Sequence, residues 1–204
     1  MNGESFWEQT LKIWIDGGPL MVPLALLTAV IYYCVLSLYL ELFTRRFNRL
    51  DENLWRHWID RPEDGAGEVG EIIRFASAHR ESTQTLRASF AEVRADYLPR
   101  IKSRIRFAMV LVSTAPLAGL LGTVTGMLKT FDGLAASAGS STASLGAGGI
   151  AEALITTETG LVIAIPGFVL ISRIKAMRDG LNLFFLRLEN AFVRKALPRL
   201  PVVT

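Results

Sequence analysis

Two glutamates, Glu152 and Glu158, interrupt a stretch of sequence that otherwise has the composition of a membrane-buried helix. They occur in GIAEALITTETGL, residues 149–161, which also carries three threonines. A charged carboxyl at the centre of a bilayer costs roughly 2.5–3.5 kcal/mol on insertion scales, and acids within membrane spans mark ion and proton pathways. The residue types therefore make proton binding the first chemistry to consider.

Hydroxyl groups from a second apolar stretch add to this set. Counted at ~1.5 Å per residue from the arginines that flank each stretch, Thr123 lies ~25 Å up one stretch and Thr157 ~24 Å up the other. On the same count Glu158 lies ~22 Å up and Glu152 ~31 Å up, close to the opposite rim. We therefore predict that the two threonines lie level with each other, below Glu152.

Each glutamate also has a purely structural explanation. Glu152 could be an interfacial residue at the mouth of a helix, and Glu158 could make a hydrogen bond between subunits. Residues six apart on a helix point ~120° from each other, so the two cannot line one narrow face equally. No His, Lys or Arg lies within the predicted spans to pair with them. If protons cross here, the missing titratable group should come from another chain.

Small residues recur at intervals of three and four in the same two stretches. In lipid, such spacing lets helix backbones approach closely, because packing must replace the hydrophobic effect there. Two prolines each remove a backbone hydrogen bond and free a carbonyl that needs a polar partner. The residues that we assign to helix packing and kinks are Ala118, Gly119, Gly122, Gly126, Gly160, Pro116 and Pro166.

The sequence carries no signature of an enzyme. His57 and His79 stand alone in a charged segment, and the single cysteine, Cys34, lies inside an apolar stretch. No phosphate-binding glycine loop or nucleophile elbow is present. We therefore predict no catalytic residues, no metal and no cofactor. The formal net charge of +3 has a membrane explanation, given below, and does not indicate nucleic-acid binding.

Three long stretches predict helices that cross a bilayer. Residues 17–40 and 107–128 carry no charge, and residues 153–172 carry only Glu158. Each is ~30 Å long or longer as a helix, which is enough to span the hydrocarbon core. Residues 44–106 hold 13 of the 22 lysines and arginines, and positive residues favour the cytoplasm. The N-terminus is therefore predicted outside and the C-terminus inside.

These signals predict an all-α integral membrane protein that forms a single domain, residues 1–204. Trp7, Leu11 and Trp14 share one face of a short N-terminal helix that is predicted to lie on the outer surface. The predicted segments are an amphipathic helix over 1–16, spans over 17–43, 107–128 and 152–172, cytoplasmic helical segments over 44–106 and 173–204, and an outer loop over 129–151.

Apolar stripes indicate how the cytoplasmic segments fold. The first helix is predicted to continue past the lipid to the turn DRPEDGAGE, and a second helix to start near Glu68 and run into the second span. One stripe includes Leu86 and Phe90, and another, in the tail, includes Phe185 and Phe192, as expected for helices packed in a bundle. Residues 133–149, small and uncharged, are predicted to form a flexible connection.

Two blocks of this sequence resemble a known family. APLAGLLGTVTGM, residues 115–127, followed by GGIAEALITTETGLVIAIPG, residues 148–167, resembles the ExbB/TolQ/MotA proton-channel family, and most of all its ExbB-type members, including the short ones of second TonB systems. GGPLMVPL at the start of the first span and LPR before the second add support. A MotA-type protein fits less well, because that branch has four spans.

The resemblance implies a motor of the bacterial inner membrane, with its N-terminus in the periplasm. A pentamer of such chains would surround single-span partners of the ExbD/TolR type, whose membrane aspartate carries the proton. Proton flow would then drive rotation and work on TonB or a TonB-like protein. The family glutamate maps onto Glu152, and the lumen threonines map onto Thr123 and Thr157.

The resemblance leaves Glu158 without an assigned role, because ExbB relatives often have a small residue there. It would add a second protonatable group or brace neighbouring subunits. Two other functions stay open: a TolQ-type motor that serves envelope maintenance, and a passive membrane scaffold that moves no ions.

Overall fold

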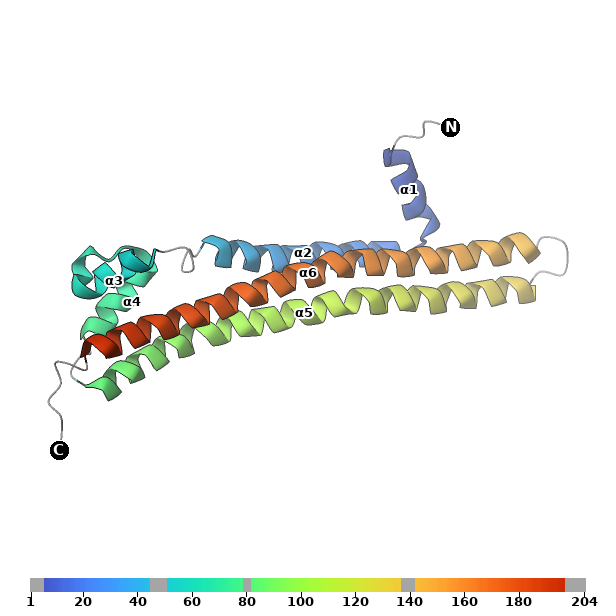
Figure 1. The fold of residues 1–204 in the computed structure, drawn as a ribbon. Helices are drawn as coiled ribbons and strands as arrows, with labels where there is room; N and C mark the ends of the chain where they lie inside the picture. The colour runs from blue at the N-terminus through green and yellow to red at the C-terminus, as the bar shows by residue number, and fades with distance from the viewer. Residues whose placement is uncertain (1–5, 45–50, 79–81, 137–141, 197–204) are drawn as a thin grey trace. The chain divides into compact units, whose positions relative to one another are not determined.

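The computed structural model describes residues 6–44, 51–78, 82–136 and 142–196, and every regular element in these ranges is a helix (Figure 1). The all-α prediction is confirmed. The elements are α1 (Phe6–Asp16), α2 (Met21–Thr44), α3 (Glu52–Asp60), a short 3-10 helix η2 (Pro62–Asp64), α4 (Gly67–Ala78), α5 (Thr83–Ala136) and α6 (Thr142–Ala196).

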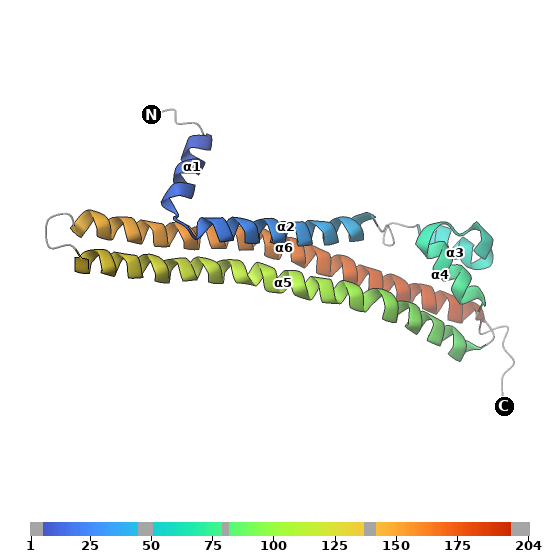
Figure 2. The ribbon, with the colours of Figure 1, turned by 180° about the vertical axis from the view of Figure 1, so that it is seen from behind.

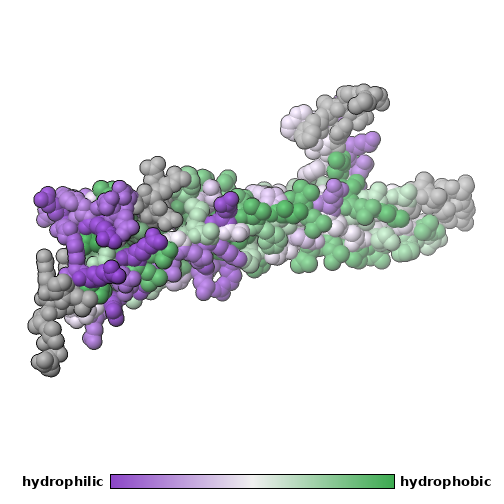
Figure 3. All heavy atoms as spheres, viewed as in Figure 1, coloured by the Kyte–Doolittle hydropathy of each residue, from purple (hydrophilic) through white to green (hydrophobic). Residues whose placement is uncertain are grey.

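Three of these helices, α2, α5 and α6, are long and apolar enough to cross a membrane, as the sequence predicts. The chain divides into two compact units, which are described separately. The first holds residues 1–37 and 106–172, and the second holds residues 38–105 and 173–204. Figure 3 shows hydrophobic residues over the surface of the first unit's long helices and hydrophilic residues gathered over α3 and α4.

In the first unit, α5 and α6 run antiparallel side by side, and α2 lies along α6 (Figures 1 and 2). Their inner faces are closely packed, with Ile31, Val35, Val112 and Ala115 fully shielded from solvent. Their outer faces carry many large apolar side chains that nothing in the chain covers, such as Leu117 at 64% exposed. Such a surface suits contact with lipid or with other membrane helices.

Helix α1 is turned away from α2 (Figure 1). Its apolar residues are uncovered, with Trp7 73% exposed and Leu11 62% exposed. The chain reverses after α1 through Gly18, whose φ of 69° lies in the left-handed region that glycine tolerates best. An exposed apolar helical face fits the predicted position at a membrane surface, which stays a prediction.

In the second unit, α3 and α4 pack with the first part of α5, up to residue 105, and the last part of α6, from residue 173, around aromatic side chains. The rings of Trp55 and Phe184 meet edge to face at 6.2 Å, and those of Phe90 and Phe192 lie 5.5 Å apart. Phe90 and Phe192 belong to the two predicted stripes and are almost completely buried. Burial of the stripes therefore explains why these charged segments fold.

Two of the predicted helix continuations are wrong. Helix α2 ends at Thr44, and α3 begins as a separate helix with Asp51 as its N-cap, whose side chain accepts a hydrogen bond from the Asn53 N–H. Helix α4 ends at Ala78, so α5 is not its continuation.

The connection predicted as flexible over 133–149 is largely helical. Helix α5 runs to Ala136 and α6 starts at Thr142, while residues 137–141 lie outside the described part of the chain. Alanine has the highest helix propensity, and this segment lacks proline. Its small residues therefore extend both helices instead of forming a linker.

Replacing Phe185 by alanine should destabilise the second unit. Its side chain is completely buried, and its ring lies 6.1 Å from both Tyr97 and Phe184. We expect a loss of ~3–5 kcal/mol, because the change removes transfer free energy and leaves a cavity. Unfolding of the detergent-solubilised protein, followed by near-ultraviolet circular dichroism, measures it. Leu183→Ala, on the exposed side of the same helix, should change the unfolding much less.

Candidate functional site

Helices α5 and α6 meet along a seam of small residues, defined here as Ala115, Gly119, Gly122 and Gly126 on α5 and Gly149, Ala153, Thr156 and Gly160 on α6. A Cβ atom added to Gly160 would fall 2.7 Å from the Ala115 carbonyl oxygen. One added to Gly119 would fall 2.9 Å from the Thr156 carbonyl oxygen. At the seam, backbone therefore lies directly against backbone, which lets the two helices approach closely.

The seam also fixes the relative heights of the two helices. Gly122 lies against the side chain of Thr156, and a Cβ atom added to Gly119 would fall 3.0 Å from the Thr157 Cα. Because the two helices are antiparallel, Thr157 lies beside Gly119, and Thr123 lies about one turn further along α5. Further along α5, the seam continues with Gly126, which lies against the Gly149 carbonyl oxygen. Whether the two threonines face a shared hydrated interior stays a prediction.

Near the end of the seam formed by Gly126 and Gly149, the side chain of Glu152 on α6 meets two other elements. Its Oε1 accepts a hydrogen bond from Lys129 Nζ on α5 at 2.6 Å. The same oxygen approaches the turn after α1 so closely that a Cβ atom added to Gly18 would fall 2.0 Å from it. The carboxyl side chain is only 19% exposed, while the lysine side chain is 51% exposed. Glu152 therefore sits at the junction of α5, α6 and the turn after α1.

Sequence reasoning missed the partner of Glu152. Lys129 lies one residue beyond the predicted end of the second span, whereas α5 continues as helix to Ala136. Because α5 and α6 run antiparallel, each residue further along α5 lies beside an earlier residue of α6. The small residues of the seam set this register, so extending it past Gly126 brings Lys129 beside Glu152. That extension is the signal from which the pair could have been found.

The two threonines use their hydroxyl groups differently. Thr157 Oγ1 donates to the Gly119 carbonyl oxygen at 2.9 Å and so connects α6 to α5. Thr123 Oγ1 donates to the Leu120 carbonyl oxygen of its own helix at 2.7 Å. Both side chains are half-buried. The structure brings Thr157 onto the seam, but no hydrogen bond joins Thr123, Thr157 and Glu152 within the described part of the chain.

Glu158 lies on a different face of α6 from Glu152. Its side chain is exposed, and its neighbours on the helix, Leu154, Leu161 and Val162, are also exposed. An ionisable group on an apolar outer face needs water or a polar group from another molecule, because lipid offers neither. The chain itself therefore does not unite the two glutamates in one site.

The proline in α6 also has a partner that the sequence did not indicate. Tyr32 on α2 donates its hydroxyl to the Ile163 carbonyl oxygen at 3.1 Å. Pro166 lies inside α6 and cannot donate a backbone hydrogen bond to the carbonyl of Val162, the neighbour of Ile163. The tyrosine therefore supplies a polar contact from the first span where the helix ladder is interrupted.

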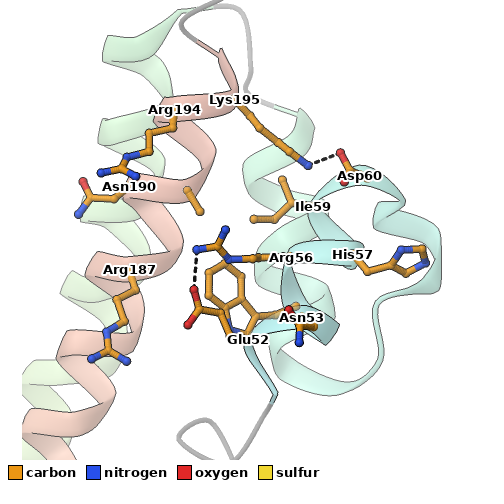
Figure 4. A pocket seen from close by; sticks show the side chains of 12 residues that line it. Glu52, Asn53, Arg56, His57, Ile59, Asp60, Arg187, Asn190, Arg194 and Lys195 are labelled. Atoms are coloured by element: carbon orange, nitrogen blue, oxygen red, sulfur yellow. Dashed lines mark hydrogen bonds and ion pairs between the residues drawn. The ribbon is translucent and has the colours of Figure 1, made fainter.

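The second unit contains a pocket of about 540 Å³ between α3 and the end of α6 (Figure 4). Its charges are largely paired, since Arg56 binds Glu52 and Lys195 binds Asp60. The labelled arginines of α6 extend away from α3. The described residues contain no cluster of His, Cys, Asp or Glu that could hold a metal ion. The pocket is therefore a weaker candidate than the Glu152 junction.

The seam, Lys129 and Glu152 all lie within a segment that matches a family model. The model of the MotA/TolQ/ExbB proton channel family matches residues 67–183, more than half of the chain. The chain belongs to this family. The family is described as one of proton channels, and proton binding is a chemistry that carboxyl and hydroxyl groups among membrane helices can perform.

Relatives within the family carry more than one name. The chain is 30% identical over 178 residues to the biopolymer transport protein ExbB-like 1 of Synechocystis, covering 78% of this chain and 69% of that protein. It is 37% identical to the biopolymer transport protein exbB1 of Vibrio cholerae, over 44% of this chain and 40% of the relative. It is 39% identical to the Tol-Pal system protein TolQ of Pseudomonas aeruginosa, over 39% of this chain and 34% of the relative.

Proposed function

We propose that this chain is a subunit of a proton-driven motor in the bacterial inner membrane. In this proposal the N-terminus is periplasmic, the C-terminus is cytoplasmic, and several copies, as a pentamer, surround single-span partners of the ExbD/TolR type. Protons passing beside the partner helix would drive movement and work on TonB or a TonB-like protein. Family membership and the three apolar helices support this assignment.

One observation carries the proposal. Glu152, a carboxyl that is mostly shielded, lies beside the α5–α6 seam in the segment that the family model matches. Carboxyls placed among membrane helices bind and release protons in pumps and transporters. Among the described residues, the chain offers no second carboxyl beside Glu152, so a relay needs a titratable group from a partner. The resemblance to ExbB-type proteins makes an ExbD/TolR-type helix with a membrane aspartate the proposed source of that group.

Reconstitution tests the motor against a passive scaffold. The chain is purified together with its single-span partner, and the mass of the complex gives its composition. The complex is then placed in vesicles and proton uptake is followed with a pH-sensitive dye. We expect uptake by the complex that exceeds uptake by the chain alone. A complex that assembles but moves no protons under a pH gradient or membrane potential would support the scaffold.

A TolQ-type motor is the second candidate function. The match to TolQ of Pseudomonas aeruginosa, at 39% identity, is as strong in identity as the match to exbB1 of Vibrio cholerae, at 37%. Deletion of the chain in its own organism distinguishes the two uses. Loss of nutrient import supports a TonB-type motor, and defects in envelope constriction support a Tol-type motor.

We expect Thr157→Val to stop proton-driven work while the complex still assembles. The substitution keeps the shape of the side chain and removes the hydroxyl that donates to the Gly119 carbonyl oxygen. Loss of that hydrogen bond costs ~0.5–1.5 kcal/mol, too little to unfold the protein. Proton uptake and co-purification measure the two effects. Thr157→Ser, which restores the donor, should retain uptake, and full uptake by the valine variant would exclude a role for the hydroxyl.

A further inference from the structure

We infer that Lys129 is a counter-ion, built into the chain, that pairs with Glu152 in the resting site and has to leave it when a proton binds. The inference deepens the proposed function and rests on it in one respect, namely that Glu152 is the proton-binding group. It adds that the resting site is an ion pair within one chain. A proton that enters must therefore compete with an ammonium group.

The geometry places the pair at a point that three elements define. Lys129 and Glu152 are 23 residues apart in sequence, yet their side chains meet at 2.6 Å. The backbone contact of Gly126 with Gly149 and Ala153, less than one turn away on each helix, sets the spacing of α5 and α6 at this height. Gly18 closes the third side, since it has no side chain that would occupy the position of the carboxyl. The contact is therefore a consequence of the packed backbone.

The ionisable groups nearest in sequence to the pair and to Gly18 do not share the pair. They are Lys12 and Asp16 on α1, Asp132 on α5 and Glu158 on α6, and the side chains of all four are exposed. None of them makes a hydrogen bond or ion pair with Glu152 or Lys129 in the described structure. Lys129 is therefore the cation that faces this carboxylate.

The exposure of the two partners indicates which of them moves. The lysine side chain is 51% exposed and the carboxyl side chain 19% exposed, so the ammonium group can return to water while the carboxyl stays. When a proton binds a Glu152 carboxylate oxygen, an O–H bond forms and the ion pair is lost. Lys129 keeps its three protons, so the net charge of the pair changes from zero to +1. Loss of the proton to a partner restores the pair.

Chemical labelling tests the pair without measuring transport. The assembled complex is treated with an acetylating reagent for amines, and the rate of Lys129 acetylation is read by peptide mass spectrometry, with Lys12 as the internal reference. An amine held against a carboxylate is less accessible to the reagent and reacts slowly. We expect Glu152→Gln to raise the rate at Lys129 several-fold, because the amine is then no longer held in a charge-assisted hydrogen bond.

A matched control removes the other carboxyl of the same helix. Glu158→Gln deletes the same charge six residues away and should leave the Lys129 rate unchanged. Equal rates in the wild type and in Glu152→Gln would overturn the inference. An equal increase in Glu158→Gln would also overturn it, because the effect would then be one of general surface charge.

The rate of proton uptake tests the consequence for function. In Lys129→Gln a proton no longer has to displace an ammonium group, so the rate of uptake at a fixed pH gradient should change several-fold. Lys129→Arg keeps the charge and should keep the wild-type rate. A wild-type rate in Lys129→Gln would overturn this inference while leaving the motor intact. Full uptake by Glu152→Gln would instead overturn the proposed function.

Discussion

Replacing Glu152 by glutamine should lower proton-driven work by roughly 100-fold or more, because a positioned group that transfers a proton typically contributes a factor of this size. Glutamine has nearly the same shape as glutamate and carries no exchangeable carboxyl proton. The substitution should therefore leave the α5–α6 seam in place. Proton uptake by reconstituted vesicles measures the loss, and co-purification with the single-span partner shows that the complex still assembles.

A suitable control removes a carboxyl that lies outside the junction. Asp132 is exposed on α5, beyond Lys129, and makes no hydrogen bond or ion pair with Glu152 or Lys129. Asp132→Asn should keep wild-type uptake. If Glu152→Gln transports as well as Asp132→Asn does, the proton does not pass through Glu152 and the motor assignment loses its main support.

Gly160→Val should have the second largest effect, and we expect it to act on assembly. The first added atom would lie 2.7 Å from the Ala115 carbonyl oxygen, which belongs to the backbone of a helix and has little freedom to move. The two helices would have to separate, at a cost of ~1–3 kcal/mol for the overpacked contact. The expected outcome is loss of folded complex from the membrane, measured by size-exclusion chromatography after detergent extraction.

Gly148→Val is the matched control for this substitution. A Cβ atom added to Gly148 meets nothing within 4 Å, although the residue lies on the same helix. The variant should therefore yield as much complex as the wild type. Comparable losses in both variants would mean that any added bulk on α6 harms assembly, and that close approach at Gly160 is not the cause.

Long-range features of the fold were predictable from sequence because they depend on composition over many residues. Three apolar stretches predict three helices of sufficient length, and the stripes that include Phe90 and Phe185 predict the buried faces of the second unit. Local boundaries were not predictable in the same way. The start of α3 at Glu52 depends on one capping side chain, and α6 includes residues 142–149 although their glycines and serines resemble a linker.

The candidate site was predictable residue by residue but not as a set of contacts. Glu152 is conspicuous because a carboxyl is costly in lipid. Its partner Lys129 and the bond from Thr157 to Gly119 depend on which residues of α5 lie opposite which residues of α6. A hydropathy pattern shows which residues share one face of a helix. It does not show which residues of a neighbouring helix lie opposite them. Tyr32 escaped notice for the same reason, since its acceptor lies on a helix 131 residues away.

The seam has a mechanical consequence for a machine that must move. Contacts made by backbone and small side chains cannot slide by a residue without driving a larger side chain into the opposite helix. Helices α5 and α6 of one subunit should therefore travel as a single strut. In the proposed motor, any turning or tilting would then have to take place on the outward faces of the helices, where side chains can rearrange.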